Sequence, residues 1–279
     1  MNVSGKAPTA AEQTAISLSQ IGWFDEGHGE PILLLHSSGA SRRQWARLRE
    51  PWSDSYRALG IDLWGYGETP LPTGADGFRL SDEVALARVL LRRLDQPFHL
   101  VGHSYGGAVA LRLALESPDL VLSISVHEPV LFHLLRERNQ TREWDEIRRI
   151  SQNVLQYVEH DNLNEAARLF VDYWNGEGAW RSLSTTQQAR TAAAARKAPL
   201  DFQALFHESD PLERYQTLAG KVLVTVGETT RAPAAKVSEL LGLAFGPDSL
   251  QVLPRVGHMA PITDPELLRP LIEKRLANS

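Results

Sequence analysis

The chain has 279 residues, of which 43% are hydrophobic and 23% charged, a composition typical of a soluble globular protein. Its formal net charge of -5 argues against nucleic acid or an anionic membrane as the main partner, and the lack of cysteine excludes disulfides, thiolate nucleophiles and cysteine-bound zinc. The first fifteen residues lack the apolar segment of a secretory signal, and no apolar run could span a membrane, so we expect a cytoplasmic protein.

Short apolar runs alternate with helical patterns, which favours a parallel sheet with helices on both faces. An antiparallel strand or two is expected within Ala15–Trp23, followed by a turn at Asp25–Pro31. The further predicted strands are Ile32–His36, Tyr56–Ile61, Phe98–Val101, Leu120–His127, Val222–Val226 and Leu250–Leu253. The expected fold class is α/β, with a mostly parallel, twisted sheet of about eight strands flanked by helices.

The region from about Phe132 to Pro211 has no strand pattern. Apolar residues recur there at helical spacing, first from Trp144 to Val158 and then from Leu163 to Trp174. The segment Ser184-Thr-Thr-Gln187 fits a capping box that begins a third helix. We therefore predict a helical cap at residues 132–211, inserted into a core that consists of residues 1–131 and 212–279.

The strongest functional signal is Gly102-His-Ser-Tyr-Gly106, a G-x-S-x-G pattern between a predicted strand and a helix rich in Ala and Leu. Gly102 and Gly106 lack the Cβ atoms that would collide in so sharp a turn. Such a turn raises the Ser104 hydroxyl above the sheet and aims backbone N–H groups of the helix N-terminus toward the same space. Ser104 is therefore the predicted nucleophile.

With this motif the chain resembles the α/β-hydrolase fold superfamily over nearly its whole length, with the helical region in the position of the family's cap. The segment Leu33–Gly39 resembles the loop that supplies the second oxyanion donor. The resemblance implies that the backbone N–H groups of Ser38 and Tyr105 form the oxyanion hole. It also identifies His258, in the segment Val256–Ile262, as the catalytic base, and it implies no metal or cofactor.

Further residues beside these motifs are candidates for contact with substrate. His36 ends the first predicted parallel strand and Ser37 follows it. His103 precedes Ser104, and Trp64 follows the strand at Tyr56–Ile61, in a glycine-rich segment similar to the family's. Aromatic residues of the cap, which indicate an apolar or aromatic substrate, complete the set. The candidate substrate-binding residues are His36, Ser37, His103, Trp64, Phe132, Trp144 and Trp174.

The acid of the triad does not stand where the resemblance first suggests it. Much of the family has a G-E-x-D pattern after the strand at Val222–Val226, but Gly227–Thr230 here reads G-E-T-T. Glu128 follows the preceding strand, where some members of the family, haloalkane dehalogenases among them, carry the acid. We therefore predict that Glu128 is the acid, with Glu228 as the fallback.

Together these residues predict a serine hydrolase of the carboxylesterase, lactonase or C–C bond hydrolase type, acting through a Ser-His-Glu triad and an acyl-enzyme. Its substrate is expected to be a small apolar or aromatic molecule with an ester-like or other carbonyl bond. Two alternatives stay open: a cofactor-free oxygenase or lyase in which His258 and the acid form a base, and a non-catalytic ligand-binding module. We expect a monomer or homodimer.

Overall fold

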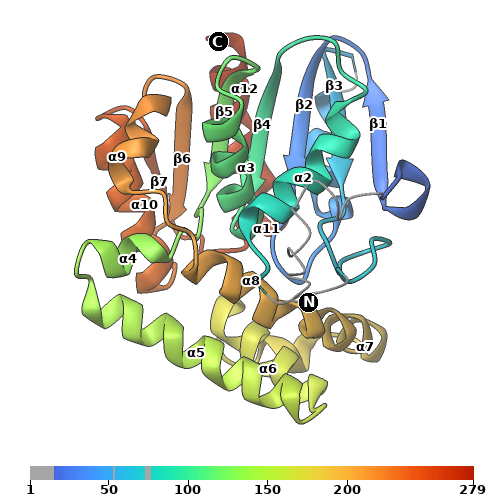
Figure 1. The fold of residues 1–279 in the computed structure, drawn as a ribbon, viewed down its shortest axis with the longest axis vertical. Helices are drawn as coiled ribbons and strands as arrows, with labels where there is room; N and C mark the ends of the chain where they lie inside the picture. The colour runs from blue at the N-terminus through green and yellow to red at the C-terminus, as the bar shows by residue number, and fades with distance from the viewer. Residues whose placement is uncertain (1–15, 53, 73–76) are drawn as a thin grey trace, which may run out of the picture.

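A seven-stranded sheet forms the centre of the computed structural model, which describes residues 16–52, 54–72 and 77–279 (Figure 1). Within these residues the strand order is β1-β3-β2-β4-β5-β6-β7. β1 runs antiparallel to β3, and the other neighbouring strands pair in parallel. The strands are β1 (Trp23–Gly27), β2 (Glu30–Leu35), β3 (Tyr56–Ile61), β4 (Phe98–His103), β5 (Val121–His127), β6 (Val222–Gly227) and β7 (Leu250–Leu253).

Helices cover both faces of the sheet and one of its ends (Figure 1). One face carries α2 (Leu80–Leu91), α3 (Tyr105–Glu116) and α10 (Ala232–Phe245), and the other carries α1 (Ala46–Arg49) and α12 (Pro265–Ala277). Below the carboxyl ends of the strands lie α4 (His133–Glu137), α5 (Thr141–Glu159), α6 (Leu163–Asn175), α7 (Thr185–Ala194) and α8 (Ala198–Phe206). The short helices are α9 (Leu212–Tyr215), α11 (Ala260–Thr263), η1 (Leu18–Gln20), η2 (Arg42–Trp45), η3 (Glu50–Trp52), η4 (Ala179–Ser182), η5 (Ala195–Lys197) and η6 (Gln216–Leu218).

The α/β fold class and six strands agree with the sequence prediction. β3 and β7 have the predicted bounds, and β2, β4, β5 and β6 differ from them by one or two residues at an end. In β2 the side chains alternate between two cores, with Ile32 and Leu34 in one and Leu33 and Leu35 in the other. Both faces are buried, which explains why such a strand reads as a continuous apolar run.

The strand and the turn that precede β2 do not lie where the sequence predicted them. Residues 16–22 form no strand, because the side chain of Gln20 accepts the backbone N–H of Ser17 (2.9 Å) and closes the turn of η1. β1 begins only at Trp23 and occupies much of the expected turn, which is reduced to His28 and Gly29. The described residues therefore form seven strands rather than about eight, while Ala15 lies outside the described residues.

The helices below the sheet contribute to two apolar clusters. α5, α6 and α7 share an apolar cluster, which includes Val154, Ala166 and Ala192. The side chains of Trp174 on α6 and of Phe202 and Leu205 on α8 belong to the main core, and Ala198 of α8 belongs to the first cluster. The Ser184 hydroxyl and the Gln187 side chain form the predicted capping box at the start of α7.

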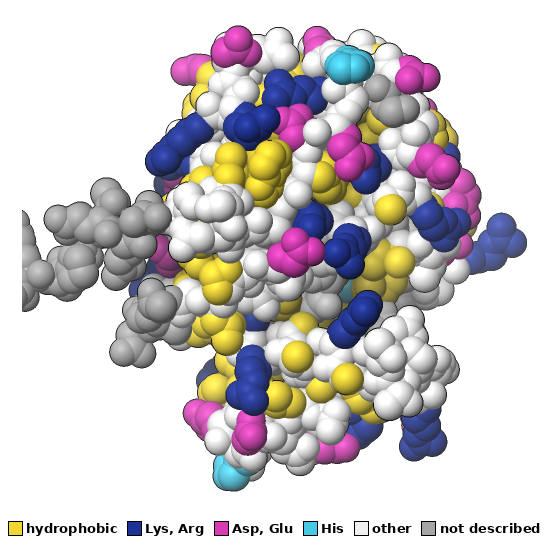
Figure 2. All heavy atoms as spheres, turned by 90° about the vertical axis from the view of Figure 1, so that its right-hand side faces the viewer, with side chains coloured by type: hydrophobic (Ala, Val, Ile, Leu, Met, Phe, Trp, Pro, Cys, Tyr) yellow, Lys and Arg dark blue, Asp and Glu magenta, His cyan; other side chains and the backbone are white. Residues whose placement is uncertain are grey.

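The surface carries charges of both signs. Figure 2 shows acidic and basic side chains interspersed over the face next to β1, and no large area of one sign. None of the helices within the described ranges is both long enough and apolar enough to cross a membrane.

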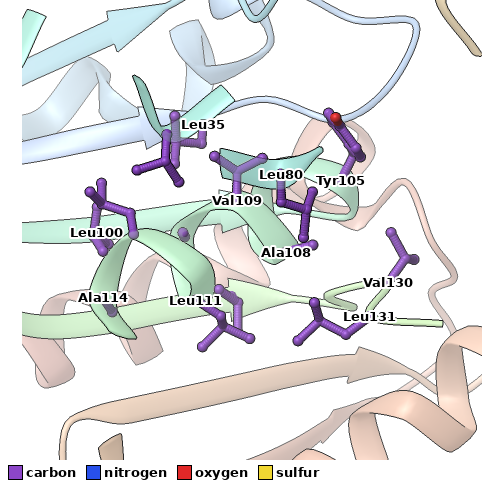
Figure 3. Packing of buried hydrophobic residues seen from close by; sticks show 14 of the residues in the cluster. Leu35, Leu80, Leu100, Tyr105, Ala108, Val109, Leu111, Ala114, Val130 and Leu131 are labelled. Carbon is purple, nitrogen blue, oxygen red and sulfur yellow. The ribbon is translucent and has the colours of Figure 1, made fainter. Parts of the chain in front are cut away.

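α3 positions the candidate site because it follows β4 after a single residue. Figure 3 shows Val109 of α3 packed beside Leu35 and Leu80 in the main core. The sharp turn depends on its glycines: a Cβ added to Gly106 would lie 2.3 Å from the carbonyl oxygen of Leu35. These contacts leave no room for any side chain at Gly106.

We expect Gly106→Ala to lower the free energy of unfolding by about 3 kcal/mol or more, because rigid backbone atoms of β2 oppose the added methyl group. The matched control is Gly107→Ala, whose Cβ would meet Pro129 at 3.2 Å and needs only a small shift. Urea unfolding of both variants measures the difference. Equal destabilisation by the two substitutions would contradict the steric argument.

Candidate active site

Ser104 lies between β4 and α3 in a conformation that is rare for a residue with a side chain. Its φ is 55° and its ψ is -117°. Such strained backbone persists only where the surroundings enforce it, and it is frequent at active sites. Its backbone N–H donates to the carbonyl of His127 (2.9 Å), which ties the turn to β5.

His258 contacts Ser104 from the loop between β7 and α11. Its Nε2 lies 2.9 Å from Ser104 Oγ, and its Nδ1 lies 2.6 Å from Glu128 Oε2. Because the ionised carboxylate of Glu128 only accepts hydrogen bonds, Nδ1 carries the proton and Nε2 accepts the Ser104 hydroxyl. The three side chains form one continuous hydrogen-bonded chain, and all three residues are buried.

The Glu128 carboxylate is held at the end of β5 by three further features. Its own backbone has a φ of 46°, Oε1 accepts the N–H of Gly227 (2.9 Å), and Oε2 accepts the Thr230 hydroxyl (2.5 Å). Burial opposes its charge, but hydrogen bonds from His258 and Thr230 and the nearby His127 lower the pKa of Glu128 to about 2. The carboxylate is therefore ionised at neutral pH.

The fallback acid, Glu228, lies elsewhere. Its carboxylate accepts the backbone N–H of Arg255 (2.8 Å), and this side chain is exposed. Thr230 stands where much of the family has aspartate. Its hydroxyl donates to the carboxylate of Glu128, which takes the place of that aspartate.

The backbone N–H groups of Ser38 and Tyr105 are available to a ligand. In the described part of the chain neither donates a hydrogen bond, whereas the Ser38 hydroxyl donates to Asp201 Oδ2 (2.5 Å). Tyr105 begins α3, so its N–H belongs to the positive end of the helix dipole. Ser38 also lines a chamber that opens at Ser104.

A small apolar chamber of about 20 Å³ opens at Ser104, with room for about one water molecule. Trp174 of α6 forms one of its walls and stacks on His258, with ring centroids 4.1 Å apart and an interplanar angle of 27°. Beyond Trp174 lies an outer cleft of about 570 Å³ that also reaches His258. The chamber is lined by Ser38, Ser104, Val130, Phe132, Phe170, Trp174, Ala198, Asp201, Phe202 and Leu205.

Phe132 and Trp174 are thus the two predicted substrate-binding residues that line the chamber. The other predicted residues contact protein groups away from it. His36 Nε2 accepts the N–H of Leu63 (2.9 Å), and the Ser37 hydroxyl donates to Gln44 (3.1 Å).

His103 Nε2 donates to the backbone carbonyl of His258 (2.7 Å) and supports the histidine loop from below. Trp64 donates from Nε1 to the carbonyl of Asp82 (3.3 Å). Trp144 packs edge-on against Phe206 with ring centroids 5.0 Å apart.

Sequence reasoning missed a buried cluster of charges beside the chamber. Lys197 Nζ contacts Glu83 Oε1 (3.0 Å) and Asp201 Oδ1, and all three side chains are buried. The spacing of Lys197 and Asp201, four residues apart on consecutive helical turns, was the only local signal. In the described ranges no group of three or more His, Asp or Glu side chains is arranged to bind a metal ion.

Comparison with known proteins shows the family and the fold. The sequence model of the alpha/beta hydrolase family matches residues 32–270. The chain belongs to this family. A solved hydrolase from Oleispira antarctica shares the fold, with a TM-score of 0.72 over 93% of this chain and 96% of that chain at 15% identity.

Two characterised relatives match a smaller part of the chain. Fluoroacetate dehalogenase from Burkholderia sp is 36% identical over 115 residues, which are 40% of this chain and 38% of that protein. Pimeloyl-(acyl-carrier protein) methyl ester esterase from Aeromonas salmonicida is 34% identical over 100 residues, 35% of this chain and 37% of that protein. The matched region spans less than half of the length of either relative.

Two buried histidines beside the triad make stability depend on pH. Burial lowers the pKa of His103 well below 6.5 and that of His127 to about 4. Between about 4 and 6.5 the unfolded chain binds more protons than the folded one, so the free energy of unfolding rises with pH. We expect a slope of up to about 1.4 kcal/mol per pH unit for each histidine.

Urea unfolding at pH 7, 6 and 5 measures this dependence. His127→Asn is expected to reduce the slope, whereas substitution of the exposed His28 by Asn leaves it unchanged. A slope that is the same in wild type and His127→Asn would contradict the assignment.

Proposed function

We propose that this protein is a serine hydrolase of the carboxylesterase, lactonase or C–C bond hydrolase type. The observation that carries the proposal is the hydrogen-bonded chain from Glu128 through His258 to Ser104, at 2.6 Å and 2.9 Å. This is the arrangement that turns a weak hydroxyl nucleophile into a reactive one. Membership of the alpha/beta hydrolase family and the esterase among the relatives support the same class.

The first half of the reaction forms an acyl-enzyme. His258 Nε2 takes the proton from Ser104 Oγ as the oxygen attacks the carbonyl carbon of the substrate. The N–H groups of Ser38 and Tyr105 donate to the resulting oxyanion, and Glu128 stabilises the imidazolium. When the tetrahedral intermediate collapses, the C–O or C–C bond breaks and His258 returns its proton to the leaving group.

The second half regenerates the enzyme. His258 Nε2 takes a proton from water, the hydroxide attacks the acyl carbon, and the same two N–H groups hold the second oxyanion. Collapse breaks the bond between the acyl carbon and Ser104 Oγ, which regains its proton from His258. The acid product then leaves the chamber.

The chamber lining favours a small apolar acyl group, since aromatic and aliphatic side chains of Phe132, Phe170, Phe202 and Leu205 surround it. The chamber has room for about one water molecule and is therefore too small for an acyl group. We therefore propose that residues 132–211 act as a movable cap, and that Trp174 turns away from His258 to open the chamber to the outer cleft.

Fluorophosphonate labelling and turnover of short-chain p-nitrophenyl esters test the hydrolase assignment. Wild-type protein is expected to bind one probe per chain at Ser104 and to release p-nitrophenol. Ser104→Ala is expected to lose labelling and to lower the turnover rate by a factor of about 10³ or more, because the nucleophile is gone.

An active Ser104→Ala variant, or wild type that neither reacts with the probe nor cleaves the esters, would show that the serine hydrolase proposal is wrong. Retained base chemistry in Ser104→Ala would support the oxygenase or lyase alternative.

Glu128→Gln is expected to lower kcat by about 10³- to 10⁴-fold, because the amide no longer orients and stabilises the His258 imidazolium. The matched control is Glu228→Gln, one strand away, where the carboxylate contacts Arg255 and not His258. Steady-state ester hydrolysis gives both values, and the opposite ranking would overturn the choice of acid.

A further inference from the structure

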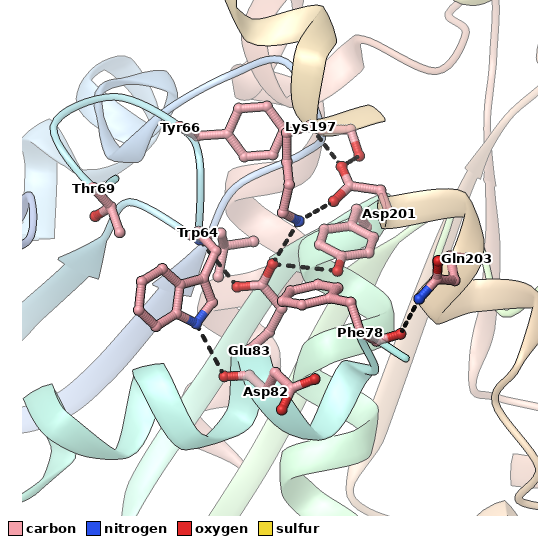
Figure 4. Close-up of polar contacts among 12 residues, drawn as sticks. Trp64, Tyr66, Thr69, Phe78, Asp82, Glu83, Lys197, Asp201 and Gln203 are labelled. Atoms are coloured by element: carbon pink, nitrogen blue, oxygen red, sulfur yellow. Dashed lines mark hydrogen bonds and ion pairs between the residues drawn. The ribbon is translucent and has the colours of Figure 1, made fainter. Parts of the chain in front are cut away.

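A buried charge cluster joins the core to the cap. It contains Glu83 of α2, Lys197 of η5 and Asp201 of α8, and Figure 4 shows the Lys197 ammonium between the two carboxylates. The exposed fractions of the three side chains are 0%, 0% and 4%. The cluster therefore lies in the protein interior, where α2 meets η5 and α8.

Two groups of the core also donate hydrogen bonds to the Glu83 carboxylate. The Tyr105 hydroxyl donates to Oε1 (3.2 Å), and the backbone N–H of Trp64 donates to Oε2 (3.1 Å). Burial opposes the charge of Lys197, but Asp201 and Glu83 raise its pKa above the usual value, so the ammonium stays charged. A buried ion cluster adds little net stability compared with apolar residues, and its value lies in the geometry that it imposes.

Asp201 connects this cluster to the oxyanion loop. Its Oδ2 accepts two hydroxyl groups, those of Ser38 and Tyr66, each at 2.5 Å. Ser38 is also the residue whose N–H is the expected oxyanion donor, and both Ser38 and Asp201 line the chamber at Ser104. The carboxylate of a cap helix thus restrains the side chain of the residue whose backbone is needed for catalysis.

We propose that Asp201 is a positioning residue that holds the Ser38 N–H in place for the oxyanion, with Lys197 and Glu83 fixing the Asp201 carboxylate in turn. This inference rests on the proposed serine hydrolase function. Lys197 also balances the charge of Asp201, so the carboxylate can orient Ser38 without leaving an unpaired negative charge near the oxyanion.

Because Asp201 lies on α8, the position of Ser38 in the oxyanion site depends on the position of α8. The same contacts bind α8 to the core, and Trp174 of α6 makes none of them, because its contact with His258 is a stacking of rings. Substrate entry past Trp174 therefore leaves the support of Ser38 intact. Binding of the ground state does not need an aligned oxyanion donor, so loss of Asp201 affects kcat more than KM.

The test compares Asp201→Asn, Ser38→Ala and the double variant. Ser38→Ala removes the restrained hydroxyl and keeps the backbone N–H. We expect each single variant to lower kcat for p-nitrophenyl esters about 10- to 100-fold, with KM changed less than about threefold. The double variant is expected to be no slower than the slower single variant, because both substitutions break one contact.

The matched control is Asp172→Asn on α6. That carboxylate accepts the backbone N–H of Trp180 (2.8 Å) within the cap and has no contact with the oxyanion loop. We expect it to lower the melting temperature and leave kcat unchanged. An Asp201→Asn variant with wild-type kcat, or a double variant whose losses multiply, would overturn the proposal.

Hydrogen exchange of residues 36–41 provides a readout that does not depend on activity. Asp201→Asn is expected to speed exchange in this loop at least about tenfold, and Asp172→Asn is not. If wild type fails to react at Ser104 but the loop still loosens in Asp201→Asn, the hydrolase proposal is wrong while the restraint on Ser38 stands. Unchanged exchange in an active enzyme that keeps its kcat would refute the positioning role alone.

Discussion

The buried contact between Glu128 and His258 is the constraint on which the rest of the site depends. The carboxylate decides which imidazole nitrogen is protonated, and so whether Nε2 can accept the Ser104 hydroxyl. Hydrogen bonds from His258, Gly227 and Thr230 offset the cost of burying its charge. The neighbouring ends of β5 and β6 therefore together hold the Glu128 carboxylate.

The helices between β5 and β6 contact this site in two different ways. Trp174 touches His258 by stacking, a contact without hydrogen bonds that a rotation of one side chain can break. Lys197 and Asp201 instead join α8 to Glu83 and to the oxyanion loop through buried charges, which are costly to separate. The chamber at Ser104 is thus bordered on one side by a stacked ring and on another by a network of buried ion pairs and hydrogen bonds.

Much of the fold could be predicted because the strands are buried on both faces and read as apolar runs. The segment before β1 was mispredicted because Ser17 and Gln20 close a local turn that an apolar pattern does not reveal. Pocket residues were harder to predict. Trp144 and Trp174 both lie on apolar helix faces, but only the packing of the helices decides that one meets Phe206 and the other His258.

The sequence by itself determined the turn at Ser104, because the turn depends on a short segment with a strong local signal, and resemblance to the family then identified His258 as the candidate base. Only the tertiary structure decided which carboxylate faces His258, since Glu128 is 130 residues away and parallel strand ends bring it there. The same holds for the contact between Glu83 and Lys197, 114 residues apart. Local sterics act within a few residues, whereas charges become partners only when the chain folds.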